Sequence, residues 1–158
     1  MPDNRPARRV SESRAVHTEI IMSAHVNGAE RLFGGQLMQW IDIVAGVVAR
    51  RHAGMDVITA SISSLEFKAP ARMNDTVELV GQIVYAGRTS MEVRVDTYVE
   101  SLSRTRTHVN RAYLTMVALG DNGLPAPVPA LIPETDEEKA EYQAAEQRKK
   151  ARRKEQTP

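Results

Sequence analysis

The sequence contains no cysteine, and this absence excludes several kinds of chemistry at once. Disulfide bonds, thiolate nucleophiles, and zinc or iron–sulfur sites with cysteine ligands are ruled out. A chain without disulfides suits a reducing compartment, and the charged N-terminus lacks the apolar segment of a secretion signal. We therefore expect a cytoplasmic protein.

Aromatic residues and long apolar runs are also scarce. Only 4% of the 158 residues are Phe, Trp or Tyr, which leaves little material for stacking nucleic-acid bases. No apolar run approaches the ~18 residues of a membrane span. The 21 basic and 20 acidic side chains nearly cancel, which argues against a protein built around nucleic acid. We expect one globular domain that uses neither a nucleic acid nor a membrane span.

Several common catalytic motifs are missing as well. The sequence has no G-x-S-x-G elbow, no Walker loop and no G-x-G-x-x-G fingerprint, so serine-triad, P-loop and Rossmann chemistry have no support. The four histidines are scattered without metal-ligand spacing. No metal site is therefore expected.

Composition divides the chain into three parts. Residues 1–12 contain three arginines and two prolines but almost no large apolar side chains, and we predict a flexible N-terminal arm there. Residues 133–158 begin acidic and end basic, the order that suits a helix dipole, and Pro133, Thr135 and Asp136 form a start signal. We predict a charged, solvated helical tail over residues 133–158 and one folded domain over residues 13–132.

Within the central domain, the pattern predicts one helix and five strands. Leu37, Ile41, Val44 and Val48 recur at helical spacing, and Gly54 is placed to end the helix. Because this helix is apolar nearly all round, we expect it to be buried. Strands are predicted over residues 15–22, 57–67, 76–86, 89–101 and 108–120. Strands joined by tight turns pair antiparallel, so we predict an α+β fold in which a five-stranded antiparallel sheet wraps around one long central helix, the hot-dog arrangement.

Asp42 is the most informative residue because it interrupts this apolar helix. An unpaired buried carboxylate is costly, so either a partner holds it or chemistry uses it. Three interpretations stay open from position alone. Asp42 is a catalytic group, or it pairs with Arg50, Arg51 or a backbone N–H, or it faces solvent.

The start of the helix offers a second candidate feature, the pair Gly34 and Gly35. Free N–H groups at a helix N-terminus carry partial positive charge, and glycine lets a substrate oxygen approach, as in an oxyanion hole. The same glycine pair would also fit a tight junction between the loop and the helix that has no role in catalysis. Asn27, in the preceding loop, has an amide that would polarise a carbonyl or form an ordinary Asx turn.

The stretch from Asn27 to Asp42, N-G-A-E-R-L-F-G-G-Q-L-M-Q-W-I-D, resembles the signature of hot-dog-fold acyl-CoA thioesterases of the bacterial single-hot-dog type. The resemblance continues through F-K-A-P at 67–70 and G-R-T-S at 87–90, and covers about residues 13–132. Two features depart from the family pattern. The loop before Asn27 lacks proline, and Glu30 and Arg31 form a charge pair where a small or polar residue is frequent.

This resemblance implies hydrolysis of an acyl-CoA thioester to a free carboxylic acid and CoA. Asp42 matches the family's catalytic carboxylate, a general base or a nucleophile, and Asn27 matches the asparagine that orients water or the thioester. The N–H groups around Gly35 and Gln36 would receive the developing oxyanion. No cofactor is required, because coenzyme A is itself part of the substrate and product.

The resemblance also implies sites for CoA and an assembly. Arg88, Thr89 and Ser90 are expected to contact pantetheine or phosphate, followed by Lys68 and Arg72. Active sites of the family span a dimer interface, so we expect a homodimer with shared active sites, further assembled as a hexamer, a trimer of dimers. The basic tail either solubilises the chain or contacts CoA phosphates.

The main alternative is a non-catalytic hot-dog module that binds acyl-CoA as a sensor. The combination of Asp42 and Asn27 argues against it, because a binder needs no acid there. A dehydratase would need a histidine near Asp42 in the signature, which is absent. A nucleic-acid or ribosome-associated role is supported only by the last ten residues.

Overall fold

The computed structural model describes residues 4–63 and 65–156. Its strands and α-helices are, in chain order, β1 (Ala7–Arg9), β2 (Ala15–Ile20), α1 (Gly34–Ala53), β3 (Asp56–Ile62), β4 (Thr76–Ala86), β5 (Ser90–Glu100), β6 (Arg106–Leu119), β7 (Ala130–Ile132) and α2 (Asp136–Gln156). Two short 3-10 turns, Val10–Glu12 and Ser23–His25, flank β2.

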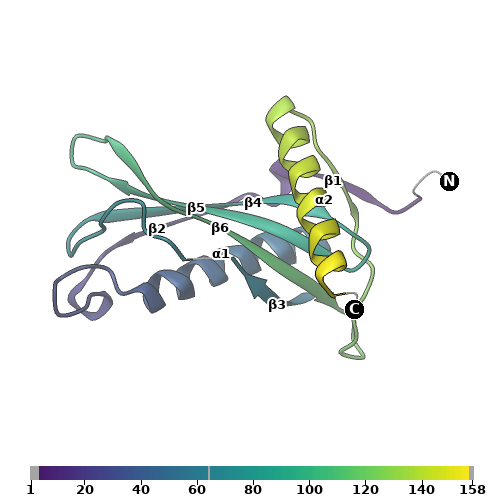
Figure 1. Ribbon diagram of the computed structural model, residues 1–158, viewed down its shortest axis with the longest axis horizontal. Helices are drawn as coiled ribbons and strands as arrows, with labels where there is room; N and C mark the ends of the chain where they lie inside the picture. The colour runs from purple at the N-terminus through teal and green to yellow at the C-terminus, as the bar shows by residue number, and fades with distance from the viewer. Residues whose placement is uncertain (1–3, 64, 157–158) are drawn as a thin grey trace.

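The main sheet has the strand order β2-β4-β5-β6-β3, and every neighbouring pair in it is antiparallel. The sheet curls over the long helix α1, which runs along one of its faces (Figure 1). The predicted hot-dog fold is therefore confirmed. The predicted strand over 57–67 is confirmed only in part, because β3 ends at Ile62. Beyond it, the Ser63 N–H still donates to the Tyr113 carbonyl and the Lys68 N–H to the Val109 carbonyl, each at 2.8 Å, so both residues lie beside β6 without being part of a regular strand.

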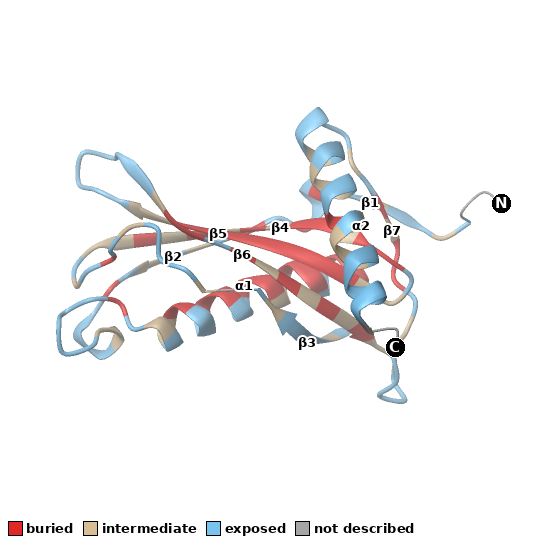
Figure 2. Cartoon of the chain, in the orientation of Figure 1, coloured by how far each residue is buried: buried red, intermediate tan, exposed pale blue. Residues whose placement is uncertain are grey.

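The alternation of β5 gives the sheet two different faces. Met91, Val93 and Val95 belong to the apolar core around α1. The side chains between them, which point to the opposite face by the period of a strand, are charged. Figure 2 shows the result, a central band of buried residues with α1 on one side and α2 across the other.

Helix α1 is shaped by glycines at two places. Gly54 takes the left-handed conformation, with φ of 70°, and its N–H donates to the Arg50 carbonyl at 2.8 Å, which ends the helix as predicted. On β4, a Cβ at Gly81 would lie only 2.6 Å from Val44 and 2.9 Å from Val48. The absence of that Cβ lets the helix pack closely on the sheet.

The outer side of α1 corrects one expectation. Leu37, Ile41 and Val48 are completely buried, but Met38 and Ile43 are among the exposed large apolar side chains. The helix is therefore not buried all round in a single chain. An apolar side left uncovered by its own chain is typical of a surface that another chain covers.

The N-terminal segment is also more ordered than predicted. β1 pairs in parallel with β7 at the far end of the chain, and Val10 is only 4% exposed. Part of the predicted flexible arm over residues 1–12 is therefore strand; residues 1–3 lie outside the described residues. A pairing across more than 120 residues leaves no local pattern in the sequence that would reveal it.

The predicted helical tail is a helix, but it is not simply solvated. Thr135 caps it, accepting the Glu138 N–H on its hydroxyl at 3.0 Å, as the start signal indicated. Ala145 is fully buried, and Glu141 and Arg148 form ion pairs with the sheet. Residues 157–158 of the predicted tail lie outside the described residues. Within the described residues, no helix is both long and apolar enough to cross a bilayer.

Candidate active site

Asp42 lies on the outer, exposed side of α1. The hydroxyl of Thr59, on the edge strand β3, donates a hydrogen bond to Asp42 Oδ1 at 2.5 Å. Arg51, one of the cations considered as a partner, instead donates to the Arg14 carbonyl at 2.8 Å. The carboxylate is therefore held by a neutral hydroxyl group.

Asp42 shares a cavity of about 390 Å³ with the start of its own helix. Gly35, Met38 and Asp42 follow one another along one side of α1, and Thr59 and Ile62 close the cavity from β3. Met38 and Ile62 give it apolar walls. The cavity thus combines one carboxylate with a lining suited to an apolar chain.

Gly35 is the residue of the helix start that lines this cavity. The first N–H groups of a helix have no partner within the helix. The Gln36 N–H donates to the Phe33 carbonyl at 3.0 Å, which leaves the Gly35 N–H as the better-placed donor of the two predicted groups. A Cβ at Gly35 would lie 2.6 Å from the Phe33 ring, so glycine also lets Phe33 lie against the helix start.

Asn27 occupies a different cavity, of about 610 Å³, on the loop before α1. Its Oδ1 accepts the N–H groups of Ala29 at 2.9 Å and Arg31 at 3.3 Å, which is the Asx turn that its position suggested. Because the oxygen is occupied, the side-chain NH₂ is the group that remains to donate to a ligand.

The structure groups the predicted residues into three places. Asn27 and Lys68 line one cavity, and the backbone of Arg72 pairs with that of Arg31, which lines the same cavity. Gly35 and Asp42 line the second cavity, and Gln36 adjoins it on α1.

The third group lies elsewhere: Arg88, Thr89 and Ser90 are at the turn between β4 and β5, at the opposite end of the sheet from the start of α1 (Figure 1). Asn27 and Asp42 of one chain therefore do not share a cavity.

Thr59 was not among the predicted site residues. Threonine is an ordinary strand residue, and its role depends on β3 passing beside α1, a contact that no local pattern indicates. The one clue to this contact in the sequence is that the strand containing Thr59 directly follows the helix containing Asp42.

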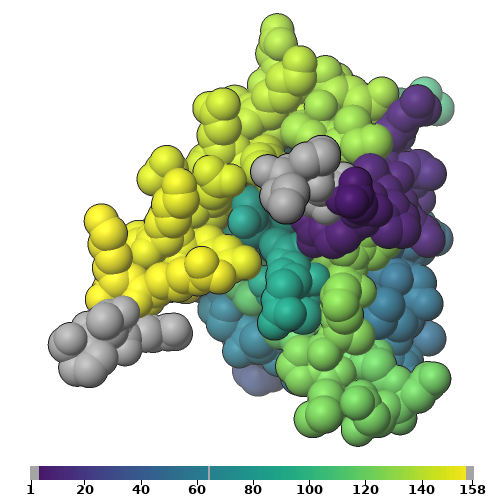
Figure 3. Space-filling view, turned by 90° about the vertical axis from the view of Figure 1, so that its right-hand side faces the viewer, coloured from purple at the N-terminus to yellow at the C-terminus, as the bar shows by residue number. Residues whose placement is uncertain are grey.

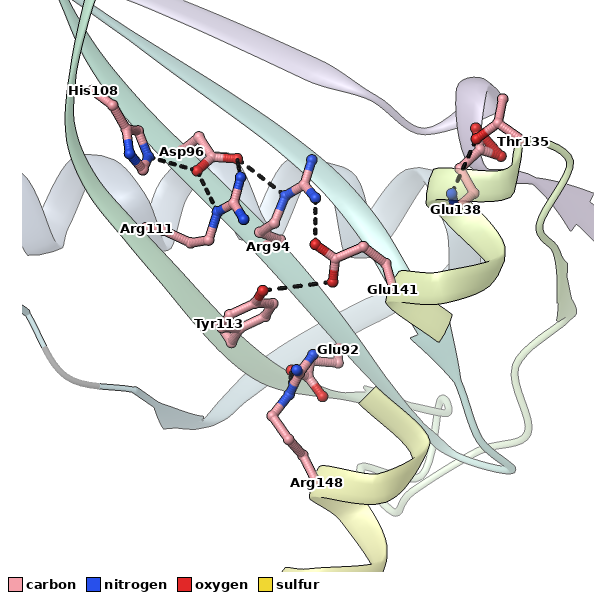
Figure 4. A network of polar contacts seen from close by, with 10 residues as sticks. All are labelled: Glu92, Arg94, Asp96, His108, Arg111, Tyr113, Thr135, Glu138, Glu141 and Arg148. Atoms are coloured by element: carbon pink, nitrogen blue, oxygen red, sulfur yellow. Dashed lines mark hydrogen bonds and ion pairs between the residues drawn. The ribbon is translucent and has the colours of Figure 1, made fainter. Parts of the chain in front are cut away.

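A second set of charged side chains lies on the other face of the sheet, beneath and beside α2 (Figure 4). Asp96 on β5 is 2% exposed and accepts hydrogen bonds from Arg111 Nε at 2.7 Å and His108 Nε2 at 2.8 Å, with Arg94 Nε at 3.0 Å. Burial alone would raise the pKa of Asp96, but the hydrogen bond and charge of Arg111 and the charge of Arg94 together hold it below its usual value.

The same face attaches α2 to the sheet. Arg94 pairs with Glu141 at 2.6 Å, and Arg148 pairs with Glu92 at 2.8 Å and lies over the Tyr113 ring (Figure 4). Burial raises the pKa of Glu92, against the opposing charge of Arg148. These carboxylates have cationic partners, in contrast to Asp42.

A five-stranded sheet curled around one long helix, with a glycine pair at the helix start and an acid on the outer side of the helix, is the arrangement of a hot-dog protein. Comparison with known proteins identifies which kind. The thioesterase superfamily model matches residues 30–105. An uncharacterized acyl-CoA thioester hydrolase of Bacillus subtilis, YkhA, is 38% identical over 147 residues, which are 92% of this chain and 86% of that protein.

Solved structures agree with the sequence comparison. An apo-hexameric acyl-CoA thioesterase superposes with a TM-score of 0.91 at 38% identity, over 96% of this chain and 98% of that one. An acyl-CoA hydrolase of Staphylococcus aureus, solved as an Asn-to-Ala variant in complex with coenzyme A, has a TM-score of 0.90 at 38% identity over 96% and 93%. Asp-to-Ala and Thr-to-Ala variants of that enzyme have been solved as well. The chain therefore belongs to the hot-dog-fold acyl-CoA thioesterase family.

Proposed function

We propose that the protein hydrolyses acyl-CoA thioesters to a carboxylic acid and CoA, with Asp42 and Asn27 as its catalytic side chains. The observation that carries these assignments is the cavity of Asp42, in which an exposed carboxylate, with no cationic partner among the described residues, shares its lining with Gly35 at the start of the same helix. Such a carboxylate is free to accept a proton or to attack a carbonyl carbon.

The reaction follows from the groups present. The thioester oxygen accepts the Gly35 N–H, which stabilises the negative charge that develops on it. Asp42 either takes a proton from a water molecule that attacks the carbonyl carbon, or attacks that carbon itself to form an anhydride that water then opens. In both cases the C–S bond breaks, the CoA thiolate leaves and takes up a proton, and the acid remains. Thr59 holds Asp42 in position through its hydroxyl.

The amide of Asn27 orients the water or the thioester, and it comes from a second copy of the chain. In one chain, Asn27 and Asp42 line different cavities, so one copy leaves the site incomplete. Among the described residues, β3 pairs with β6 alone, so its other edge, next to Asp42, is uncovered. Exposed apolar side chains lie on β3, on α1 and just before α1: Ile58, Met38, Ile43 and Phe33. A two-fold homodimer that covers this surface would complete two sites.

The relatives support this proposal in two ways. The three residues replaced in the S. aureus variants have the same types and the same spacing in sequence as Asn27, Asp42 and Thr59. Two of the similar structures are hexameric thioesterases, so we extend the dimer to a hexamer, a trimer of dimers. Lys68 and Arg72, near the Asn27 cavity, are proposed to contact CoA.

Subunit mixing tests the shared site. Asp42→Asn and Asn27→Ala homo-oligomers should each release almost no thiol from acyl-CoA. After the two are denatured together and refolded, half the dimers are mixed, each with one intact site, so activity should return to about one quarter of wild type.

The outcomes separate the hypotheses. Sites contained within one chain would give no recovery on mixing, which would refute the shared site but not the hydrolase. Tight acyl-CoA binding by wild type with no thiol release from any acyl chain length would refute the hydrolase and favour the sensor.

A further inference from the structure

Asn27 stands in a small loop between β2 and α1 whose two ends meet at His25. The Phe33 N–H donates to the His25 carbonyl at 2.9 Å, and inside the loop the Asn27 N–H donates to the Arg31 carbonyl at 2.9 Å. Phe33 is the residue directly before α1. Residues 25–33 are therefore a narrow loop whose base adjoins the start of α1.

This loop lies away from α2 and from the N-terminal segment. It is at the left end of the molecule in Figure 1, whereas Figure 3 looks at the other end, where α2 and the N-terminal segment lie. A backbone hydrogen bond from the Met73 N–H to the Glu30 carbonyl, at 3.1 Å, holds the outer part of the loop. At the base of the loop, the His25 side chain adds further contacts.

The half-buried His25 side chain makes two contacts that fix this base. Its Nδ1 accepts the Met22 N–H at 2.9 Å, so the neutral ring carries its proton on Nε2. Its ring meets the indole ring of Trp40 edge to face, with the ring centres 4.9 Å apart and an interplanar angle of 70°. Trp40 is 6% exposed and belongs to the core packed around α1. One side chain thus ties the base of the loop both to the chain before it and to α1.

The choice of histidine is more specific than the local turn requires. The His25 N–H also donates to the Met22 carbonyl at 2.9 Å, so the two residues are bonded in both directions across the turn Ser23–His25, in the manner of a capping box. Glutamate or glutamine is the usual side chain in that role. Neither would place an aromatic ring against Trp40, whereas histidine supplies the acceptor and the ring together.

We propose that His25 is a positioning residue for Asn27, which sets the place of the Asn27 amide through the Met22 N–H and the Trp40 ring. The proposal rests on the proposed function, in which Asn27 completes the active site of a second copy. An amide presented to another chain has to be fixed from within its own chain, because a catalytic group works only when supporting contacts hold it in place.

Three substitutions separate the two contacts. His25→Ala removes both, His25→Phe keeps a ring against Trp40, and His25→Asn keeps an acceptor for the Met22 N–H. We expect His25→Ala to lower kcat about 10²-fold, the effect of a small misplacement of a catalytic group, with the KM for acyl-CoA within about twofold of wild type. His25→Phe and His25→Asn should each recover about tenfold of that loss.

A second histidine provides the matched control. His17→Ala removes a half-buried histidine whose ring is hydrogen-bonded to Glu19 on β2, and it should leave kcat unchanged. The melting temperature of every variant checks that the protein stays folded.

Subunit mixing shows on which group His25 acts. Mixed dimers of His25→Ala and Asp42→Asn have one site with an intact loop and an intact Asp42, so activity should return to about one quarter of wild type. Mixing His25→Ala with Asn27→Ala should give no recovery, because every site then lacks Asn27 or has it misplaced. The reverse pattern would show that His25 acts through α1 on Asp42 of its own chain, and would overturn the proposal. So would no recovery in either mixture, if Asn27→Ala and Asp42→Asn do complement each other.

Amide hydrogen exchange tests the contacts without relying on hydrolysis. The amides of residues 25–33 should exchange about tenfold faster in His25→Ala than in wild type, and His25→Asn should restore part of the protection. Faster exchange in a protein whose wild type releases no thiol would support the positioning of the loop by His25 while the hydrolase itself is refuted. Unchanged exchange, or an unchanged kcat in His25→Ala beside an active wild type, would overturn the proposal.

Discussion

The two faces of the curled sheet carry acids in opposite situations. On the α1 side, Asp42 is exposed and has a single neutral hydroxyl as its partner. On the α2 side, Asp96 is buried and is held by Arg111, His108 and Arg94. A carboxylate whose oxygens are engaged by several cations has little capacity left to act on a substrate, whereas one held by a single hydroxyl has lone pairs left to contact a ligand.

The two helices also pack against the sheet through different interactions. α1 packs through fully buried aliphatic residues such as Leu37, Ile41 and Val48. α2 contributes one fully buried alanine, Ala145, and is held mainly by ion pairs. Because burial of aliphatic surface stabilises a fold more reliably than ion pairs do, α1 contributes more to the free energy of folding than α2 does.

The largest expected effect is the loss of thioesterase activity when Asp42, rather than Asp96, is replaced. Asp42→Asn should lower kcat about 10²- to 10⁴-fold, because the base or nucleophile is lost, while the melting temperature stays within about 2 °C of wild type. Thiol release and calorimetry measure the two quantities. Asp56→Asn, which alters an exposed acid at the start of β3, is the control and should change neither. An unchanged kcat in Asp42→Asn would show that Asp42 is not catalytic, and the functional contrast between Asp42 and Asp96 would be wrong.

The next largest effect concerns Arg94, on the α2 side of the sheet, and we expect it to change stability but not activity. Arg94→Met leaves Glu141 without its cation and removes one partner of Asp96, so the free energy of unfolding should fall by about 3–5 kcal/mol. Denaturant unfolding measures it. Activity at saturating substrate should persist in the folded fraction.

A second substitution checks that charge causes this loss. Arg94→Met combined with Glu141→Leu removes both members of the pair, and should be clearly more stable than Arg94→Met alone. If the double variant is no more stable than the single one, packing rather than the uncompensated acid explains the cost, and the contrast between the faces is weaker than stated.

A smaller effect concerns the hydroxyl that holds Asp42. Thr59→Val keeps the shape of the side chain but removes the hydrogen bond, and kcat should fall about tenfold with the KM little changed. Thr59→Ser restores the hydroxyl and should recover most of kcat, which a purely structural role in β3 would not predict.

These contrasts also mark what the sequence could predict. The period of Leu37, Ile41 and Val48 revealed the helix, and Asp42 stood out because it interrupts that period. Its partner Thr59, the pairing of β1 with β7, and the ion pairs of α2 depend on contacts between distant segments, which no local pattern reports. The expectation that this helix is buried nearly all round was wrong for the same reason, since one apolar side of it is left uncovered by its own chain. The catalytic and CoA-binding roles of the predicted residues stay predictions.

The smallest expected effect separates the two faces by pH. His52, at the end of α1, is fully buried, its Nε2 donates to the Pro129 carbonyl at 2.8 Å, and burial lowers its pKa despite that hydrogen bond. A base with a lowered folded pKa contributes stability above its unfolded value, about 6.5, and loses it as the pH falls through the folded pKa. Asp96, an acid with a lowered pKa, loses its contribution only below about pH 4, where the unfolded carboxyl begins to bind protons. The free energy of unfolding should therefore fall more in wild type than in His52→Gln, which keeps a donor for Pro129 without titrating, when the pH is lowered from 7.5 to 5; denaturant unfolding at several pH values measures it. Identical pH dependence of the two proteins in this window would show that His52 does not contribute to the pH dependence of stability. That dependence would then come from the charged residues on the α2 side of the sheet.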